Sequence, residues 1–405
     1  MSPADHHQPD RTLHTYLPGI TERLLGVRGS PHLPGITERL RRCYNGSMTQ
    51  IMVAMSGGVD SSLAAALLHE QGHQVVGVTM HLWDDDDDRL AESLCCAAEM
   101  AESARRVCAQ LAIPYYVFNY QREFRRHVID YFVQAYTQGL TPNPCLECNR
   151  EIKFRALLER ARALGFAYVA TGHYARVVRP DAATAPYELR RAVDQDKDQS
   201  YMVYMLGQQD LARLLFPIGE LTKAQVRAAA AARGLASADR PESQDICFVP
   251  GGDYRNLLRE EAVESLRPGP IVDLTGREVG RHNGLPLYTI GQRRGLGLGG
   301  GATRYVVDID VARNALIVGP PEAMLRDRFM VDRTSFVTGA APTEPFTCAV
   351  QVRAHATTAP AEVTPLGNGR LAVHLQAPLK AITPGQAAVF YADDRVLGGG
   401  RIIRP

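Results

Sequence analysis

The pattern of hydrophobic positions differs between two successive regions of the chain. From Met48 to about Val249, short apolar runs alternate with amphipathic stretches. This alternation predicts parallel strands with helices packed on both faces of the sheet. The expected strands cover residues 51–55, 74–80, 115–119 and 167–171, and the expected helices cover residues 62–71, 97–111 and 152–164.

After about residue 258 the apolar positions recur at every second residue, which predicts β structure. The string "GPIVDLTGREVG" predicts two strands joined by a turn, and "RYVVDIDVARNALIVG" predicts a hairpin around residues 312–314. From Phe329 onward, short apolar runs separated by Gly, Pro or Asp are typical of a small barrel. We therefore expect an α/β domain over residues 48–258, a small β domain over 259–322 and a C-terminal β-barrel over 323–405.

Residues 1–47 do not follow either pattern. The string "LPGITERL" occurs twice, at residues 17–24 and 33–40. Two short copies are too few to bury a core in the way that repeat proteins do. We expect this segment to be a disordered extension, or upstream sequence included through an early start codon, and to be dispensable for stability and activity.

Composition and charge narrow the class of protein. The chain is 45% hydrophobic and 22% charged, which is ordinary for a soluble globular protein. No apolar run reaches the ~18 residues that a membrane-spanning helix needs, and the N-terminus does not resemble a signal peptide. We expect a cytoplasmic protein with no membrane partner, whose 8 cysteines form no structural disulfide framework. Because the net charge is only +1, any nucleic acid must bind to local basic surfaces.

The string "VAMSGGVDSSLAAALL" is a candidate phosphate-binding loop between the first strand and the first helix. Gly57 and Gly58 allow the backbone to approach an anion, and the helix that follows presents its N-terminal amides. The loop has no Gly-Lys-Ser/Thr ending, so transfer of a γ-phosphate is disfavoured. It resembles the ATP-pyrophosphatase loop, in which the α-phosphate of ATP is attacked and pyrophosphate leaves. The alternative is a plain strand–helix turn capped by Asp60 and Ser61.

The string "NPCLECN" contains two cysteines whose role depends on their partners. A zinc site would need a second CxxC pair or a Cys/His pair, and the sequence has neither at a suitable spacing. A thioredoxin-type redox pair would leave the phosphate loop unexplained. A third cysteine, Cys247, lies far downstream in "ESQDICFVPGGDY", in the irregular sequence expected for an active-site loop.

Several strings together resemble the tRNA-specific 2-thiouridylase family from about Met48 to the C-terminus. They are "SGGVDSS", "TPNPCLECNREIKF", "ATGHYAR", "DKDQSYMVYML", "ESQDICF", "LYTIGQRRGLG" and "TPGQAAVFY". The resemblance implies an adenine nucleotide alpha hydrolase-like ATP-pyrophosphatase domain followed by the two β domains. It also implies that ATP adenylates O2 of the wobble uridine (position 34) of tRNA and that sulfur displaces AMP. In that chemistry Cys148 is the nucleophile, Cys247 carries a persulfide received from an upstream carrier protein, and the two cysteines form a redox disulfide. Because the thiolate is the reactive form, we expect both cysteines to be partly exposed and near positive or donor groups.

The same resemblance assigns the remaining site residues. The expected ATP-binding residues are Ala54, Met55, Ser56, Gly57, Gly58, Val59, Asp60, Ser61, Met80 and Gly172. The residues expected to contact the target base or the tRNA are Asn143, Pro144, Cys145, His173, Lys197, Asp198, Gln199, Arg353, Ala354 and Gln386. Ala354 stands where relatives carry an aromatic residue, so stacking is lost there. Magnesium is expected with the ATP phosphates, with Asp60 a better candidate ligand than the acidic run 84–88. Arg293 and Arg294 are candidate phosphate contacts.

Cys145 departs from the family pattern, because many members carry an aspartate at this position. Cys145, Cys148 and Cys247 together could hold a [4Fe–4S] cluster with one open iron site, which would make the sulfur donor an iron-bound sulfide. Another ATP-pyrophosphatase, such as a 4-thiouridine synthase, is a second alternative. A redox-active CxxC protein and a non-catalytic RNA-binding protein are further alternatives, and neither would require ATP.

Overall fold

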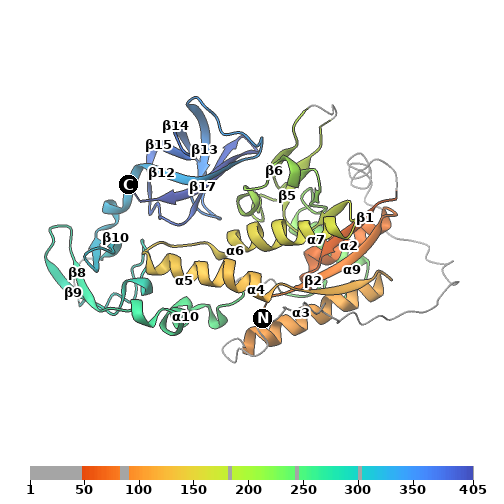
Figure 1. Cartoon of the computed structure of the whole chain (residues 1–405), viewed down its shortest axis with the longest axis horizontal. Coiled ribbons are helices and arrows are strands. Elements are labelled where there is room, and N and C mark those ends of the chain that lie inside the picture. Colours follow the sequence, from red (N-terminus) through yellow and green to blue (C-terminus); the bar gives the residue numbers. More distant parts are fainter. Residues whose placement is uncertain (1–47, 83–90, 181–184, 242–245, 300–302, 405) are drawn as a thin grey trace, which may run out of the picture. The chain divides into compact units, whose positions relative to one another are not determined.

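The computed structural model of the chain describes residues 48–82, 91–180, 185–241, 246–299 and 303–404 (Figure 1). The N-terminal 47 residues and the acidic run 84–88 lie outside the described residues, so the predictions made for them stay predictions. In the part that is described, no helix combines the length and the apolar character needed to cross a membrane.

The first part of the chain forms a five-stranded parallel sheet in the order β3-β2-β1-β4-β7. Its strands are β1 (Gln50–Ala54), β2 (Gln74–His81), β3 (Tyr115–Asn119), β4 (Tyr168–Ala170) and β7 (Leu214–Leu215). The expected parallel sheet is thereby confirmed. The β1 strand occupies the centre, so the loop that follows it begins at the middle of the carboxyl edge of the sheet.

Alternate side chains of β1 enter two different hydrophobic cores. Ile51 and Val53 pack in one core with α2 (Val59–Glu70), α3 (Ala91–Gln110) and α9 (Lys223–Ala232). Met52 and Ala54 pack in the other core with Phe124, Phe132 and other residues of the helical segments between β3 and β4. Both faces of the sheet are therefore covered, which explains why its strands are continuous apolar runs.

The helices between β3 and β4 carry the segment with the two cysteines. They are α4 (Gln121–Phe124), η2 (Arg125–Ile129), α5 (Asp130–Thr137), α6 (Pro144–Glu147), η3 (Cys148–Ala156) and α7 (Leu157–Ala163). The sequence pattern did not predict a helical segment over residues 121–137. The helix expected from residue 152 begins earlier, at Pro144, and continues through the π-helical turns of η3, which are frequent at functional sites.

Shorter helical segments connect the other elements. They are η4 (Ser200–Val203), α8 (Gln208–Leu211), η5 (Pro250–Gly252), α10 (Tyr254–Glu261), η6 (Val263–Ser265), η7 (Leu285–Leu287) and η8 (Pro321–Met324). The expected helix at residues 62–71 begins earlier, at Val59, because Gly58 is its extended N-cap residue. The helix expected at 97–111 likewise begins earlier, at Ala91.

A four-stranded sheet in the order β10-β11-β8-β9 follows the α/β part. Its strands are β8 (Gly269–Val272), β9 (Glu278–His282), β10 (Tyr305–Asp310) and β11 (Ala315–Gly319). Both hairpins predicted from the sequence are confirmed, since β8 pairs with β9 and β10 with β11 in antiparallel register.

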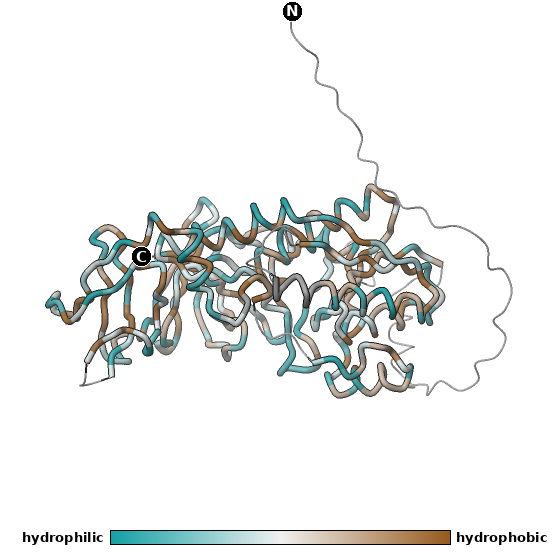
Figure 2. The backbone as a smooth tube through the Cα atoms, turned by 90° about the horizontal axis from the view of Figure 1, so that it is seen from below, coloured by the Kyte–Doolittle hydropathy of each residue, from teal (hydrophilic) through white to brown (hydrophobic). Residues whose placement is uncertain are grey.

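The last part of the chain forms a closed antiparallel barrel. Its strands are β12 (Leu325–Phe336), β13 (Phe346–Gln351), β14 (Ala359–Gly367), β15 (Arg370–Lys380), β16 (Ala387–Ala392) and β17 (Arg395–Ile403). They pair in the order β12-β15-β14-β13-β16-β17, and β17 pairs again with β12. Buried and exposed side chains alternate along much of β14 and β15. Hydrophobic and hydrophilic stretches follow one another along the backbone near the C-terminus in Figure 2. The inward side chains of the barrel strands form a separate core around Phe390 and Val350.

A hairpin from the α/β part extends the barrel sheet. It consists of β5 (Ala175–Val178) and β6 (Glu188–Arg191), and β6 pairs with β17 at the register Arg190↔Arg395. The sequence pattern did not predict this pairing. The hairpin begins shortly after β4, and its second strand connects the carboxyl edge of the α/β sheet to the barrel.

Candidate active site

The phosphate loop is held in shape by its own serines and glycines. Ser61 Oγ accepts a hydrogen bond of 3.1 Å from the Ser56 amide, and Ser62 Oγ donates to the Gly58 carbonyl at 2.8 Å. Gly57 has a positive φ of 76°, and a Cβ atom there would lie 2.1 Å from the Met100 carbonyl oxygen. Gly57 is therefore required for α3 to approach the loop, whereas Gly58 has space around it. The Ser56 side chain is exposed at the mouth of the loop.

Asp60, in the first turn of α2, is bound by two residues from outside the loop. Lys223 Nζ lies 2.9 and 2.8 Å from the two carboxylate oxygens of Asp60, and Tyr174 donates its hydroxyl to Asp60 Oδ1 at 2.8 Å. The Lys223 side chain is 12% exposed and that of Asp60 is 29% exposed. The carboxylate that we expected near magnesium is thus neutralised by a lysine of α9.

The segment after β4 links the phosphate loop to the rest of the site. A Cβ atom on Gly172 would lie 2.6 Å from the Ser61 amide nitrogen, so only glycine permits this close packing on the loop. The next residue, His173, is buried, and its ring lies 5.4 Å from that of Phe154 and 5.9 Å from that of Phe216. This segment occupies the carboxyl edge of the parallel sheet, where such folds bind ligands.

His173 is a neutral imidazole near neutral pH. Burial lowers the pKa of His173 well below 6.5, and the charge of Lys153 lowers it further. Its Nδ1 atom shares a 2.7 Å hydrogen bond with Thr171 Oγ1. His173 is therefore a buried, neutral side chain and not a surface histidine.

The segment with Cys145 and Cys148 is a capped helix start. Asn143 is the N-cap residue, and its Oδ1 accepts hydrogen bonds from the amides of Cys145 (3.1 Å) and Leu146 (3.3 Å). Pro144 occupies the first helical turn, where its missing N–H costs nothing. The Asn143 side chain thus fixes the backbone that carries both thiols.

Cys247 is fixed by its neighbour Phe248. The ring of Phe248 lies 5.8 Å from that of Phe124 and 5.4 Å from that of Phe132, in edge-to-face packing. Phe248 is almost completely buried, while Cys247 itself is exposed. An aromatic anchor therefore holds an exposed thiol on an otherwise irregular segment.

The three thiols lie close enough for their charges to interact with one another and with Lys153. Surrounding protein atoms raise the pKa of Cys145, Cys148 and Cys247, the nearby thiols raise that of Cys148 and Cys247 further, and Lys153 lowers all three. All three are free thiols in the structure. Lys153 is on η3, and it is a cation that the sequence analysis did not single out.

Our expectation that both reactive cysteines are partly exposed is wrong for Cys148. This residue is 7% exposed, because the first turn of η3 packs into the core beside Leu146 and Ile152. Cys145 and Cys247 are the exposed members of the set.

The three residues Lys197, Asp198 and Gln199 are part of a link to the barrel. Asp198 forms a 2.8 Å ion pair with Arg191, in which the Asp198 side chain is only 5% exposed. Arg191 also donates to Gln351 Oε1 at 3.0 Å and stacks over the ring of Tyr391. Asp198 is thus a buried structural partner of the barrel in this structure, and Lys197 beside it is partly exposed.

Gln199 connects the same segment to the carboxyl edge of the sheet. Its Oε1 accepts a 2.9 Å hydrogen bond from the Tyr174 amide, and its own amide donates to the Tyr174 carbonyl at 2.7 Å. Since Tyr174 also binds Asp60, hydrogen bonds connect the 197–199 segment with the phosphate loop.

Gln386 and Arg353 are on the barrel. Gln386 Nε2 donates to the Thr141 carbonyl at 2.8 Å, so the barrel contacts the segment that leads into Cys145 and Cys148. Arg353 is an exposed residue that donates to the Ala381 carbonyl at 2.9 Å, and Ala354 beside it is half-buried.

The other predicted residues line the same sheet edge or are exposed elsewhere. Met80, near the end of β2, is half-buried and packs against the core that contains Cys148. Ala54, Met55 and Val59 are buried. Arg293 and Arg294 are exposed on the segment after η7.

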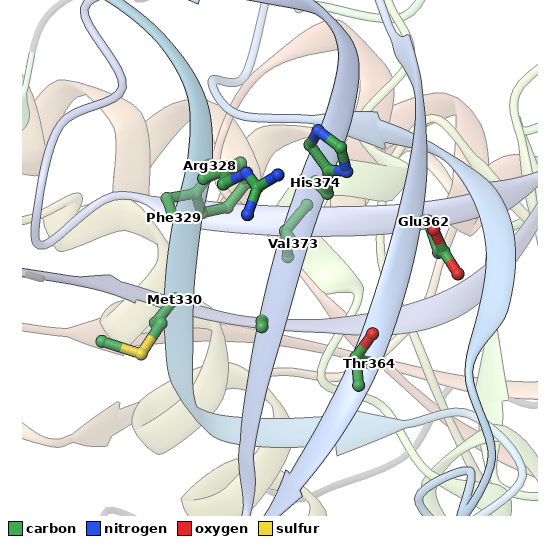
Figure 3. Close-up of a pocket in the computed structure, with 8 residues that line it drawn as sticks. Arg328, Phe329, Met330, Glu362, Thr364, Val373 and His374 are labelled. Carbon is green, nitrogen blue, oxygen red and sulfur yellow. The ribbon is translucent and has the colours of Figure 1, made fainter.

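A hollow of about 340 Å³ lies elsewhere, on the outer face of the barrel (Figure 3). It is lined by residues of β12, β14 and β15, among them the exposed Arg328, Glu362 and His374 and the buried Phe329 and Val373. None of the predicted site residues lines it.

Comparison with known proteins covers every domain of the described chain. The family described as "tRNA methyl transferase HUP domain" matches residues 49–251, the "tRNA methyl transferase PRC-barrel domain" matches 255–320, and the "Aminomethyltransferase beta-barrel domain" matches 326–402. A protein of Roseiflexus castenholzii named tRNA-specific 2-thiouridylase MnmA is 69% identical over 371 residues, which cover 88% of this chain and 100% of the relative. The chain belongs to the tRNA-specific 2-thiouridylase family.

Two other members of the tRNA-specific 2-thiouridylase family extend the similarity. The protein of that name from Chloroflexus aggregans is 72% identical and covers 88% of this chain and 99% of the relative. The one from Symbiobacterium thermophilum is 48% identical and covers 88% of this chain and 92% of the relative. The family resemblance inferred from the motifs is thus confirmed, together with the fold.

Three residues that the sequence analysis missed interact with the predicted site residues. Lys223 and Tyr174 bind Asp60, and Lys153 acts on the three thiols. Tyr174 and Lys153 lie within the quoted motifs "ATGHYAR" and "NREIKF", so the sequence analysis could have found both residues from these motifs. Lys223 lies in "LTKAQVRAAA", which carries no motif that we recognised.

Asp60 and the three thiols are the candidate metal ligands among the predicted site residues. Magnesium usually keeps several waters and takes one or two protein carboxylates together with substrate phosphates, and Asp60 can supply one. Across residues 48–82, 91–180, 185–241, 246–299 and 303–404, no group of three His, Cys, Asp or Glu side chains is arranged to hold a metal ion. The cluster route stays an alternative prediction for the three free thiols.

Proposed function

We propose that this chain catalyses the ATP-dependent 2-thiolation of the wobble uridine (position 34) of tRNA. ATP adenylates O2 of the uridine, pyrophosphate leaves, and sulfur then displaces AMP at C2. The sulfur is carried as a persulfide on Cys247. The membership of the tRNA-specific 2-thiouridylase family and the high identity to its named members support this activity.

One geometric observation carries the proposal beyond the family name. The segment Gly172–Tyr174 contacts the phosphate loop through Gly172 and Tyr174, and His173 between them interacts with Lys153, whose charge also acts on the three thiols. A uridine bound at this edge would thus have the α-phosphate of ATP on one side and the sulfur donor on the other. Adenylation and sulfur transfer require both neighbours.

The sulfur-release step uses Cys148 as the nucleophile. Its thiolate attacks the inner sulfur of the Cys247 persulfide, forming the Cys148–Cys247 disulfide and releasing hydrosulfide. The two thiols are oxidised by two electrons, and the terminal sulfur atom is reduced by the same two. Hydrosulfide then attacks C2, AMP leaves with the former O2, and an external dithiol reduces the disulfide before the next turnover.

Lys153 and His173 support this step through their charges. Burial raises the pKa of Cys148, and Lys153 opposes this effect, so the lysine increases the fraction of thiolate. His173, neutral and held by Thr171, offers a hydrogen bond to the base and no competing positive charge. Asn143, Pro144 and Cys145 would contact the target base from the capped helix.

ATP and magnesium would occupy the phosphate loop. The residues that would hold ATP are the loop residues 54–61, Gly172 and Met80, and Asp60 would contribute a carboxylate to the magnesium ion. The tRNA body would contact Lys197–Gln199, Arg353, Ala354 and Gln386. An upstream persulfide carrier protein would supply the sulfur, and the reaction would take place in the cytoplasm.

Mass spectrometry of tRNA from a strain that lacks this chain tests the proposal. We expect 2-thiouridine at the wobble position to disappear and to return with the wild-type gene but not with Cys148→Ser or Cys247→Ser. Normal wobble 2-thiouridine would contradict the proposal. Loss of 4-thiouridine alone would favour a 4-thiouridine synthase instead.

A further inference from the structure

The phosphate loop contains no cation of its own. Its residues 54–61 include one charged side chain, the carboxylate of Asp60, in the first turn of α2. A triphosphate placed against the loop amides and the helix N-terminus would therefore meet a negative charge. Phosphate sites in proteins normally compensate such charge with Lys, Arg or a metal ion.

A lysine distant in the sequence reaches the loop at this point. Lys223 is the first residue of α9, and its ammonium group contacts both oxygens of Asp60 at 2.9 and 2.8 Å. The backbone of α9 is already capped there, because Asp194 accepts from the Lys223 amide and Thr222 accepts from the Gln225 amide. The contribution of α9 to the loop is thus the Lys223 side chain rather than the helix end.

The helix pair does not require this contact for its packing. Helices α2 and α9 share a hydrophobic core that includes Leu63 and Val226. At the opposite end of the pair, Arg233 forms a bidentate ion pair with Glu70 at 2.6 and 2.8 Å. The two ion pairs join the same helices, but only the one with Lys223 lies at the phosphate loop.

The contacts of Asp60 allow the lysine to bind a second anion. Tyr174 donates its hydroxyl to Asp60 Oδ1 at 2.8 Å, so the carboxylate keeps an oriented partner when the ammonium group shifts. The Lys223 side chain is largely shielded from water, which strengthens its interaction with a phosphate group.

We infer that Lys223 supplies the cation missing from this loop and binds the triphosphate of ATP directly, beside Asp60. The inference rests on the proposed function, since it concerns the ATP that the thiolation consumes. It assigns a binding role to a residue that lies outside all the sequence motifs by which the family was recognised. Lys223 thereby takes the part that a loop lysine has in other phosphate-binding loops.

The test measures nucleotide binding and turnover in variants of the full-length chain. For Lys223→Met we expect the Kd for ATP to rise by about 10- to 100-fold, the effect of losing a charge-assisted bond to phosphate. Binding of adenosine, which has no phosphate, should stay within about twofold. Lys223→Arg should bind ATP more tightly than Lys223→Met, because the charge is kept. Lys223→Gln should repeat the result of Lys223→Met if the latter folds poorly.

Two further variants separate phosphate binding from a structural role. Arg233→Met removes the other ion pair between the same helices, and we expect its Kd for ATP to match that of the wild type. The double variant Asp60→Asn with Lys223→Met removes both charges of the pair. Because Asp60 is also the proposed magnesium ligand, ATP binding of these variants is measured without magnesium. If Lys223 binds phosphate, the double variant still binds ATP weakly. Recovery to within a few-fold of the wild type would mean that the lysine only neutralises Asp60, and would overturn the inference.

Failure of this inference and failure of the proposed function give different results. ATP binding and tRNA-dependent AMP release by the wild type, unchanged in Lys223→Met, would overturn the role of Lys223 alone. A wild-type chain that neither binds ATP nor releases AMP with tRNA would overturn the proposed function, and this inference with it.

Discussion

The side-chain amide of Gln386, in the barrel, donates a 2.8 Å hydrogen bond to the carbonyl oxygen of Thr141. Thr141 also donates its amide to the Pro384 carbonyl at 2.8 Å. These two bonds attach the segment before Asn143, and therefore the helix start with Cys148, to a turn of the barrel. A residue expected from the family to contact tRNA thus also holds the segment that carries the proposed nucleophile.

We predict that Gln386→Ala lowers the kcat of thiolation by about three- to tenfold, the cost of one lost hydrogen bond. Single-turnover rates and tRNA affinity, measured separately, check this. Gln208→Ala is the matched control, because Gln208 joins the hairpin to the barrel through the carbonyls of Tyr187 and Val337. A rise of tenfold or more in the Kd for tRNA with unchanged kcat would mean that Gln386 acts only through RNA contact.

The buried ion pair of Arg191 and Asp198 predicts a stability effect. Replacing Arg191 by Met leaves the Asp198 carboxylate without its cation in a shielded site, which should cost about 3–5 kcal/mol in the free energy of unfolding. Chemical denaturation measures this cost. Arg105→Met, which breaks an exposed pair with Glu102, should leave the free energy of unfolding unchanged within error. Equal effects of the two substitutions would contradict the buried network.

His173 predicts how stability depends on pH. Its folded-state pKa lies well below 6.5, so below pH 6.5 the unfolded chain binds a proton that the folded chain does not. The contribution of His173 to stability is therefore complete above about pH 6.5 and is lost as the pH falls, with a slope of up to about 1.4 kcal/mol per pH unit. We expect His173→Gln to show a flatter loss between pH 6.5 and 5 in denaturation experiments. A slope identical to the wild type would contradict a buried neutral imidazole.

Cys145 distinguishes the persulfide route from a cluster route. If only Cys148 and Cys247 change oxidation state, Cys145→Ser should keep a measurable thiolation rate, while Cys148→Ser and Cys247→Ser should have none. Anaerobically purified wild type and Cys145→Ser should be assayed together for iron, acid-labile sulfide and tRNA thiolation. About four irons per wild-type chain, lost with the activity in Cys145→Ser, would establish the cluster instead.

The sequence predicted the parts of the fold that depend on local patterns. The β3 strand, residues 115–119, was located to the residue, and the hairpins around 273–277 and 312–314 follow from their turns and alternation. The phosphate loop was found because Gly57 and Gly58 lie between an apolar run and a helical one. Each of these signals is contained in a few adjacent residues.

The rest depends on contacts that no local pattern encodes. The pairing of β6 with β17 joins Arg190 to Arg395, and the contact of Lys223 with Asp60 joins two helices from different parts of the chain. The burial of Cys148 was missed because it follows from the packing of η3 against residues of other helices. Family resemblance named the cysteines but not Lys223, since "LTKAQVRAAA" reads as an ordinary helix start.

The central claim is that Cys247 and Cys148 transfer sulfur to an adenylated uridine. Single-turnover reaction of the persulfide-loaded chain with ATP and unmodified tRNA tests it most directly, with 2-thiouridine, AMP and the cysteine oxidation state measured by mass spectrometry. We predict one 2-thiouridine, one AMP and one Cys148–Cys247 disulfide per turnover, and neither 2-thiouridine nor AMP without ATP. Formation of 2-thiouridine by the Cys247→Ser variant at the wild-type rate, or in the absence of ATP, would contradict the account.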